Sequence, residues 1–349
     1  MTCFEDLFNE LLHEIFDYLD GYQLYKAFSD LNFRFEKLLH SSSMLYKTHI
    51  FLSENDEFIN KLKKFIVSNR HQMYSMHLNF ILQDSYFFSQ LLSNSSFDHL
   101  ECILVKVVQS DILIPILFNL SYLSCLFALT IEAWCIKEKI NDIYRLIFVL
   151  RKLKYYRMFC FNDDHLITLS LATNNQCSPL ERLIINHRCS LNELESLIPY
   201  TLELRQLTSH QTDSNITMLQ SITLINLMFI YLHMCKISFY ELKTFLVNIS
   251  SALKILSIHC SENIFFLDAH RWEQFISYYY PQLEKFYFTY YDRIDNDNQY
   301  EIYSQRINQF SSTFWIKRQW IFHVKIDTSD IKYTIYPYKY IDQYLFIEN

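Results

Sequence analysis

Glycine is almost absent from this chain, which has one, Gly21, in 349 residues. Phosphate-binding and dinucleotide-binding loops need glycine because their backbone must approach the ligand closely. The G-x-S-x-G elbow of many hydrolases needs two glycines. The sequence therefore contains no P-loop, no Rossmann fingerprint and no such elbow. We expect a protein that is not an enzyme and that uses no cofactor.

Metal-binding and disulfide frameworks are also missing. The nine cysteines include no C-x-x-C pair, and the thirteen histidines are spread singly. His13 and Glu14 begin like the zinc-protease motif H-E-x-x-H, but Asp17 stands in the last position. The run Asp163-Asp164-His165 has no nucleophile at a recognisable spacing. We expect no metal, and scattered cysteines behind an acidic N-terminus favour a reducing compartment, cytoplasmic or nuclear.

Positive charge is scarce as well. The net charge is −7, and residues 1–44 carry −5 of it, with eight acidic and three basic side chains. The one basic run, Lys61 to Lys64, has the spacing of a solvated helix face, so we expect no nucleic acid as a partner.

Two uncharged stretches, Ile112 to Ile131 and Asn215 to Cys235, are long enough to span a membrane. Pro115 and the L-x-x-L phrases inside them favour a buried helix followed by a buried strand, so we expect no membrane insertion.

An amphipathic helix opens the chain. Apolar residues recur three and four apart from Phe8 to Leu19, which predicts one stripe on a helix of about three turns. We expect Gly21 to end this helix in the left-handed conformation. Two shorter helices should follow, one around Leu24 and Phe28 and one around Phe35. Three short helices bury too little surface to be stable alone, so some of the stripe must be covered by the rest of the chain or by another protein.

This segment resembles an F-box, the helical module that docks substrate receptors on the Skp-type adaptor of cullin–RING ubiquitin ligases. Phe8 stands where the family usually has a proline, and Phe35 lies near the place of an absent tryptophan. The matching residues are Leu7, Glu10, Leu11, Leu12, Ile15, Phe16, Tyr18, Leu19, Leu24 and Leu31. The resemblance implies that the adaptor is bound by Leu7, Phe8, Leu11, Leu12, Ile15, Phe16, Leu19 and Leu24.

A repeated phrase, L-x-x-L-x-L, follows the helices. It begins nine times, at Met73, Leu100, Leu123, Leu153, Leu180, Leu204, Leu224, Leu253 and Leu283, in steps of 20 to 30 residues. Such a period is typical of leucine-rich repeats, in which each strand and helix bury their apolar face only by stacking on neighbours. Four helix caps precede the strands by 14 or 15 residues: Ser85, Ser190, Ser238 and Asp268. The serines at 190 and 238 each begin a capping box with a glutamate three residues later.

The chain thus resembles F-box proteins with a leucine-rich-repeat-like tail. We expect an α/β fold with an F-box-like helical module over residues 1–44 and an irregular solenoid of parallel strands over 45–295. The pattern breaks near residue 296. Apolar segments from Phe314 to Ile326 and from Ile331 to Tyr336 predict two or three β-strands in a C-terminal cap over 296–349.

The resemblance implies a substrate-recognition adaptor that performs no covalent chemistry. Its partners would be the Skp-type adaptor with the cullin scaffold, and an unknown target protein held on the concave face of the strands. Alternate strand positions should form that face. They select Tyr155, Arg157, Arg182, Asn186, Gln206, Thr208, His259, Lys285 and Tyr287.

Two other interpretations stay open. The opening stripe could belong to an ordinary helix that packs on its own domain, and the polar strand face could contact only water. If the opening helix packs on its own domain, the chain would be a repeat scaffold that binds a partner without any ligase, with its N-terminal helices as a cap. Limited proteolysis near Ser41 to Ser43 should release a tethered docking module but not a packed cap.

Overall fold

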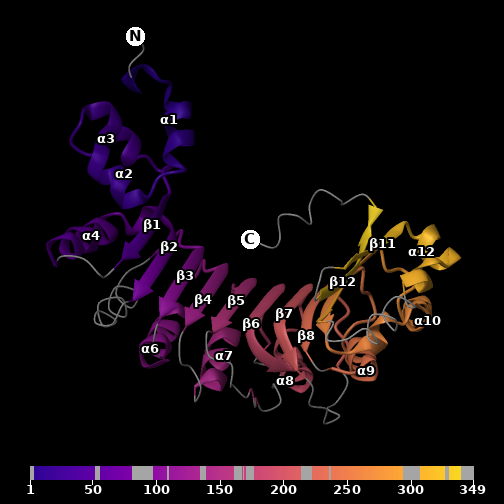
Figure 1. The fold of residues 1–349 in the computed structure, drawn as a ribbon. Coiled ribbons are helices and arrows are strands. Elements are labelled where there is room, and N and C mark those ends of the chain that lie inside the picture. Colours follow the sequence, from indigo (N-terminus) through magenta and orange to yellow (C-terminus); the bar gives the residue numbers. More distant parts are fainter. Residues whose placement is uncertain are drawn as a thin grey trace. The chain divides into compact units, whose positions relative to one another are not determined.

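The computed structural model describes residues 4–51, 56–80, 97–107, 110–133, 139–160, 167, 169, 177–213, 222–235, 237–293, 307–326 and 330–338. The chain folds into two compact units, residues 1–162 and 163–349. Each unit is α/β and contains a sheet of mostly parallel strands with helices packed along one face (Figure 1). The α/β class and the mainly parallel strand arrangement are therefore confirmed.

The first unit begins with three short helices and continues with strands that alternate with helices. The helices are α1 (Asn9–Phe16), α2 (Gly21–Phe28), α3 (Phe33–Leu39), α4 (Asp56–Ser68), α6 (Ser110–Leu120) and α7 (Ile140–Phe148), with the 3-10 turns η1 (Phe4–Asp6) and η2 (Arg70–Gln72). The strands are β1 (Tyr46–Phe51), β2 (Met73–Phe80), β3 (Cys102–Val107), β4 (Ala128–Ala133) and β5 (Tyr155–Cys160). All neighbours pair in chain order and in parallel.

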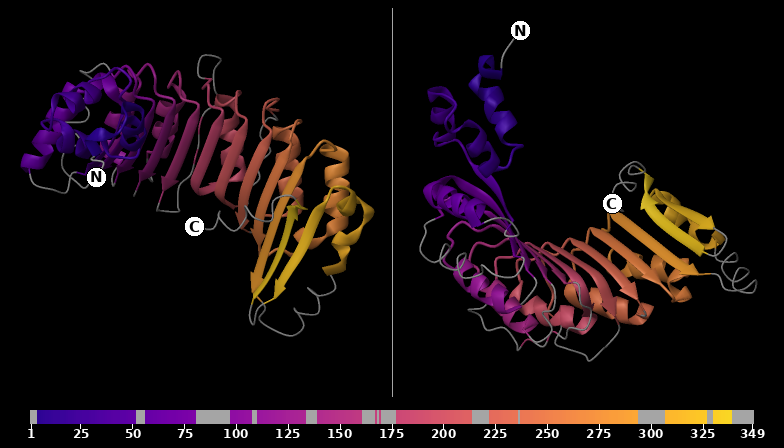
Figure 2. Two further views of the ribbon diagram at one scale, coloured as in Figure 1. Left: turned by 90° about the horizontal axis from the view of Figure 1, so that it is seen from above. Right: turned by 60° about the vertical axis from the view of Figure 1, so that its left-hand side comes forward.

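The second unit repeats the alternation and closes with a hairpin (Figure 2). Its strands are β6 (Arg182–Ser190), β7 (Gln206–Asp213), β8 (Phe229–Cys235), β9 (Ile255–Ser261), β10 (Lys285–Arg293), β11 (Trp320–Ile326) and β12 (Asp330–Pro337). Its helices are α8 (Leu191–Leu197), η4 (Ile198–Tyr200), α9 (Phe239–Ile249), η5 (Ile264–Leu267), α10 (Ala269–Tyr279), η6 (Ile307–Ser311) and α12 (Thr313–Lys317). Strands β6 to β10 are parallel, whereas β12 is antiparallel to β10 and β11 to β12.

Side chains alternate between two faces of the strands. On β5, Tyr156 and Met158 are buried on the helical side, and Tyr155 and Arg157 lie on the opposite face. Because strand residues two apart share a face, one row of each strand builds the core. Within the described residues of each unit the opposite, open face carries no helix.

The strand pairing corrects two of the predicted repeat starts. Leu129 of β4 pairs with Ile103, and Ile230 of β8 pairs with Leu207. The third and seventh repeats therefore begin at Leu126 and Leu227, both buried, and not at Leu123 and Leu224. In both places two overlapping L-x-x-L phrases are offset by three residues, and periodicity alone selected the earlier one. With this correction the steps range from 23 to 30 residues.

Three of the four predicted helix caps are confirmed. The Oγ atoms of Ser190 and Ser238 accept hydrogen bonds from the backbone amides of Glu193 and Glu241. In turn, the carboxylate of each glutamate accepts a hydrogen bond from the backbone N–H of the serine. Asp268 caps α10 by accepting from the amide of Arg271. Ser85 lies outside the described residues. These caps fix where each helix begins and so where it meets the neighbouring strand.

Gly21 does not have the predicted role. No glycine has a positive φ, and Gly21 is the first residue of α2, capped by Asp20. A Cβ at this position would lie 2.8 Å from both Thr48 Oγ1 and Tyr46 Cβ. The glycine is therefore required for the close approach of α2 to β1, and α1 ends without it.

The segment after residue 312 is also different from the prediction. Phe314 to Ile316 belong to helix α12 and not to a strand. The two segments that follow, β11 and β12, are the strands found among the described residues of this region. In the first uncharged stretch, α6 is followed by β4, as expected for a buried helix and strand. No helix in the described part of the chain is long and apolar enough to cross a membrane.

Candidate functional site

A small aromatic core holds the three N-terminal helices together. Phe16 of α1, Phe28 of α2 and Phe35 of α3 meet with ring centroids between 5.1 and 6.5 Å apart. Tilted ring pairs of this kind contribute about 0.5–1.5 kcal/mol each beyond the burial of their area. Leu12 and Leu24 are fully buried as well. The helices therefore form a closed cluster with an apolar interior of its own.

A second apolar row on α1 faces solvent. We call Phe8, Leu11, Ile15 and Leu19 the α1 stripe; their exposed fractions are 76%, 44%, 37% and 41%. They follow one another at intervals of three and four residues, so they lie on one side of α1 and the turn after it. Tyr18, next to them, is 90% exposed. Apolar rows of this kind mark interaction sites when they are contiguous.

The eight residues predicted to bind the adaptor thus differ in exposure and fall into three groups. Leu12, Phe16 and Leu24 are buried in the helical cluster, so in this conformation they support the surface and do not form it. Leu7 is half-buried. The other four are the α1 stripe. A sequence pattern detects that a helix has two adjacent apolar rows but cannot tell which row its own neighbours cover.

The start of α1 is held by a side chain from α3. Phe8 is the N-cap and makes no side-chain cap bond. Instead, Arg34 donates from Nε and Nη2 to Asn9 Oδ1, at 3.0 and 2.7 Å, and from Nη2 to the carbonyl of Leu7. This clamp fixes the chain at the position where F-box sequences, which this segment resembles, usually have proline. The phenylalanine at position 8 is therefore compatible with a well-defined start of the helix.

The helical cluster is also tied to the first strands. Asp20 Oδ2 accepts from the backbone amide of His49 at 2.7 Å and lies 3.1 Å from its Nδ1, while Oδ1 caps α2. The rings of His49 and His77 then meet edge to face at 4.3 Å. Gln72 Nε2 donates to the carbonyls of Leu39, Ser41 and Met44. Within the first unit, the N-cap of α2 is thus bonded to β1, and the end of α3 is bonded to η2, which directly precedes β2.

The predicted substrate-binding residues lie on the open faces of the two units. Tyr155 and Arg157 belong to β5 of the first unit. In the second unit Arg182 pairs with Gln206, while Thr208 and Tyr287 lie in one row across β7 to β10. Asn186, His259 and Lys285 are half-buried on the same face, and Thr208 is almost fully buried. The seven residues of the second unit thus share a face, but Thr208 offers little surface.

A ring cluster at the centre of this face was missed by the sequence analysis. Tyr231 of β8 contacts His210 and His259 with ring centroids 5.1 and 5.2 Å apart, and His233 lies 6.0 Å from His259. Burial raises the pKa of the Tyr231 phenol and lowers the pKa of the His233 imidazole. Gln206 and Thr208 were selected from the sequence because they are the third and fifth residues of the phrase that begins at Leu204. With the corrected start at Leu227, Phe229 and Tyr231 take these two places on β8. The pattern that would have selected Tyr231 was therefore present, but the start of the phrase had been placed three residues too early.

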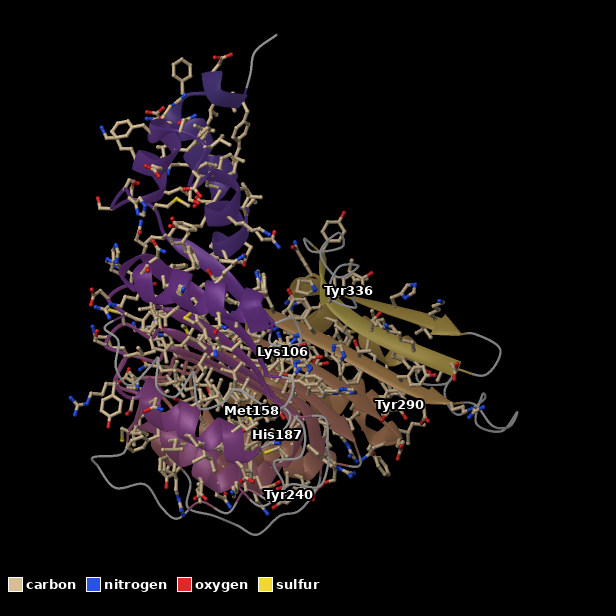
Figure 3. The ribbon with its side chains drawn as sticks, turned by 90° about the vertical axis from the view of Figure 1, so that its left-hand side faces the viewer. Lys106, Met158, His187, Tyr240, Tyr290 and Tyr336 are labelled. Carbon is tan, nitrogen blue, oxygen red and sulfur yellow. The ribbon has the colours of Figure 1, made fainter. Side chains whose placement is uncertain are left out.

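An ion pair lies on the open face of the first unit. Lys106 of β3, labelled in Figure 3, pairs with Glu132 of β4 at 2.8 Å. Among the described residues no group of three or more histidine, cysteine, aspartate or glutamate side chains could hold a metal ion. His13 and Asp17 both lie on or next to α1 without such a group. The run Asp163-Asp164-His165 is outside the described residues.

No family model matches the sequence, and no curated protein resembles it closely enough to count as a match. The resemblance to the F-box and to leucine-rich repeats therefore depends on the residues quoted above. The structure shows, in addition to these residues, that the apolar side chains of α1 form one buried row and one exposed row.

Proposed function

We propose that the chain is a substrate-recognition adaptor of a Skp–cullin–F-box type ubiquitin ligase. One observation carries the proposal: the α1 stripe is apolar, contiguous and exposed, on a helix whose other apolar row is buried. A helix that only packed on its own domain would need one apolar row. Complete burial of a fully exposed side chain of this kind contributes about 1.5–3 kcal/mol, and the part of each stripe residue that is still exposed would contribute a share of this on contact, so an uncovered row of four favours a partner.

The proposed partner is the Skp-type adaptor, because the stripe residues occupy F-box positions. The acidic character of residues 1–44 and the short helices agree with this assignment. The open strand faces would hold a target protein. The chain itself would make and break no covalent bond; it would raise the concentration of a target lysine near the charged ubiquitin.

A repeat scaffold without ligase association is the second candidate. The bonds from Asp20 to His49 and from Gln72 to Leu39, Ser41 and Met44 favour it, because they are what a capping module needs. These bonds also mean that limited proteolysis cannot separate the two interpretations. The segment Ser41 to Ser43 lies between bonded residues, so resistance to proteolysis is expected under both interpretations.

Direct binding to the adaptor separates the candidates. We expect the full chain to bind a purified Skp-type adaptor, and Leu11→Asp or Ile15→Asp to abolish this binding, because each change places a charge in an apolar contact. The matched control is Val67→Asp on α4, which is 46% exposed in the same unit and outside the stripe. Circular dichroism should show that all three variants stay folded. The measurement is isothermal titration calorimetry.

Two results would overturn the proposal. The first is a folded wild-type chain that shows no binding to the adaptor. The second is binding that Leu11→Asp and Ile15→Asp leave unchanged. If Val67→Asp abolished binding equally, the contact would not be the α1 stripe.

A further inference from the structure

A groove lies between α9 and α10 on the helical side of the second unit. Its volume is about 780 Å³, which is in the range of small-ligand sites. Its lining consists of Phe239, Tyr240, Lys243, Arg271, Gln274, Phe275, Ser277, Tyr278 and Tyr279. Most of these follow helical spacings of three and four, so each helix presents one continuous side to the groove. None of them belongs to the open strand face or to the α1 stripe.

Aromatic rings form the walls of this groove. Phe239 and Phe275 are anchored, with the Phe239 ring 4.9 Å from that of Trp272. Tyr240, labelled in Figure 3, and Tyr278 are 66% and 79% exposed. The Tyr278 ring meets the Tyr279 ring edge to face at 4.7 Å. The groove thus combines a fixed apolar floor with exposed phenol rings.

The cations of the groove are not equally neutralised. Arg271 forms an ion pair with Asp268 at 3.1 Å. Lys243 has no carboxylate within ion-pair distance in the described part of the chain; its Nζ lies over the Tyr279 ring, 5.1 Å from the centroid. None of the described residues that line the groove carries a carboxylate. The acidic residues of the two helices are engaged elsewhere, since Glu241 bonds the Ser238 amide and Glu273 accepts from Ser312.

We propose that this groove binds an aromatic anion, a planar ring that carries a phosphate. The ring would stack on the exposed tyrosines, and the phosphate would pair with Lys243. Gln274 and Ser277 supply further hydrogen-bond donors. Aromatic contact and one uncompensated cation are both needed for such a ligand, and the groove offers both in a space large enough to admit it. The inference is independent of the proposed ligase function.

Three probes test the two halves of the recognition separately. We expect phenyl phosphate to bind the full chain saturably, and inorganic phosphate and phenol each to bind at least about tenfold more weakly. Lys243→Gln should weaken phenyl phosphate about tenfold, and Tyr278→Ala should weaken it severalfold by removing a stacking partner. The control is Lys254→Gln, whose exposed ammonium pairs with Glu284 outside the groove. Tyrosine fluorescence and calorimetry report the affinities.

The source of the aryl phosphate is tested with a phosphotyrosine pentapeptide. If the pentapeptide binds more tightly than phenyl phosphate, the proposal is supported and the ligand is a segment of a protein. If the two bind equally, the proposal is supported and the ligand is a free small molecule. The proposal is overturned by absence of saturable binding, by equal affinity for inorganic phosphate, or by an unchanged affinity in folded Lys243→Gln. Adaptor binding by the α1 stripe would be unaffected by any of these results.

Discussion

Position 21 requires a glycine because its contact with β1 leaves no room for a side chain. Its φ is ordinary for a helix, so an alanine there would adopt the backbone conformation without difficulty. The obstacle is the pair of atoms, Tyr46 Cβ and Thr48 Oγ1, that a Cβ would approach to 2.8 Å. Tyr46 Cβ is bonded directly to the backbone of β1 and cannot rotate away, whereas Thr48 Oγ1 moves only by rotation about χ1. The need for glycine at this position is therefore a consequence of the close packing of α2 against β1.

Gly21→Ala should destabilise the first unit by about 1–3 kcal/mol, the usual cost of overpacking. An alanine in an unobstructed helix would instead stabilise by about 0.5–1 kcal/mol relative to glycine. Urea denaturation of the full chain measures the difference. Gln23→Ala, at an exposed position of the same helix, is the control and should change little. A stabilising effect of Gly21→Ala would contradict the close approach of α2 to β1.

Position 8 is suited to proline, the residue that F-box sequences usually have where this chain has Phe8. Its φ is −63°, the value that proline enforces, and its N–H donates to no acceptor among the described residues. Phe8→Pro should therefore stabilise the helical cluster by about 0.4–1 kcal/mol, by restricting the unfolded chain. Phe8→Ala, which removes the same ring without fixing φ, is the control and should not stabilise. A loss of stability in Phe8→Pro alone would show that the start of α1 has another conformation.

His77 connects the N-terminal helices with the strands through His49 and Asp20. Burial, together with the nearby charges of His49 and Lys106, lowers the pKa of His77, and Asp20 and Glu132 oppose this shift. The unfolded chain therefore takes up this proton more readily than the folded chain. The contribution to stability is complete above the unfolded pKa, about 6.5, and is lost as the pH falls through the lower folded value.

Hydrogen exchange of β1 and β2 should show this pH dependence. We expect protection to fall between pH 7.5 and 5.5 beyond the intrinsic change in exchange rate, and His77→Gln to remove most of that fall. Comparing variant with wild type at the same pH cancels the intrinsic rate. His323→Gln, at an exposed position of β11, is the control. An equal loss of protection in wild type and His77→Gln would contradict the role of His77.

Helices and strands of the repeats were largely predictable, because their signals are local. The capping boxes at Ser190 and Ser238 and the cap at Asp268 place α8, α9 and α10 correctly. The two repeat starts at Leu126 and Leu227 were not predictable, since overlapping phrases carry the same pattern and only strand pairing selects one. The same ambiguity concealed Tyr231. Strand β1 was missed for a related reason: Tyr46, Thr48 and Ile50 alternate, but no repeat phrase precedes them.

Long-range contacts explain the remaining differences. The division of the opening stripe depends on Phe28 and Phe35, which come from the next two helices and cover Phe16 but not Ile15. Gly21 was assigned from the usual conformation at a helix end, whereas its contact lies about 25 residues further on, in β1. The groove between α9 and α10 combines side chains about 30 residues apart, so neither helix predicts it alone.

The second unit ends its sheet with the hairpin of β12 and β11. Strand β12 satisfies the edge of β10 in antiparallel register, and Trp320 covers Phe286 with ring centroids 5.6 Å apart. Arg318 fastens the hairpin by donating to the carbonyls of Leu283 and Pro281, at 2.6 and 2.9 Å. An uncovered edge strand with an apolar face is a template for association. The hairpin therefore prevents β10 from pairing with other chains.

A chain cut after Arg293 should consequently associate or precipitate, because the edge of β10 and the ring of Phe286 lose their cover. Light scattering coupled to size-exclusion chromatography at several concentrations measures this. A chain cut after Tyr338 keeps the hairpin and should behave like the full chain. If the shorter chain stayed monomeric with an unchanged melting temperature, the hairpin would be dispensable and β10 would need another explanation for its solubility. If both cuts caused association, residues beyond the hairpin would carry the effect.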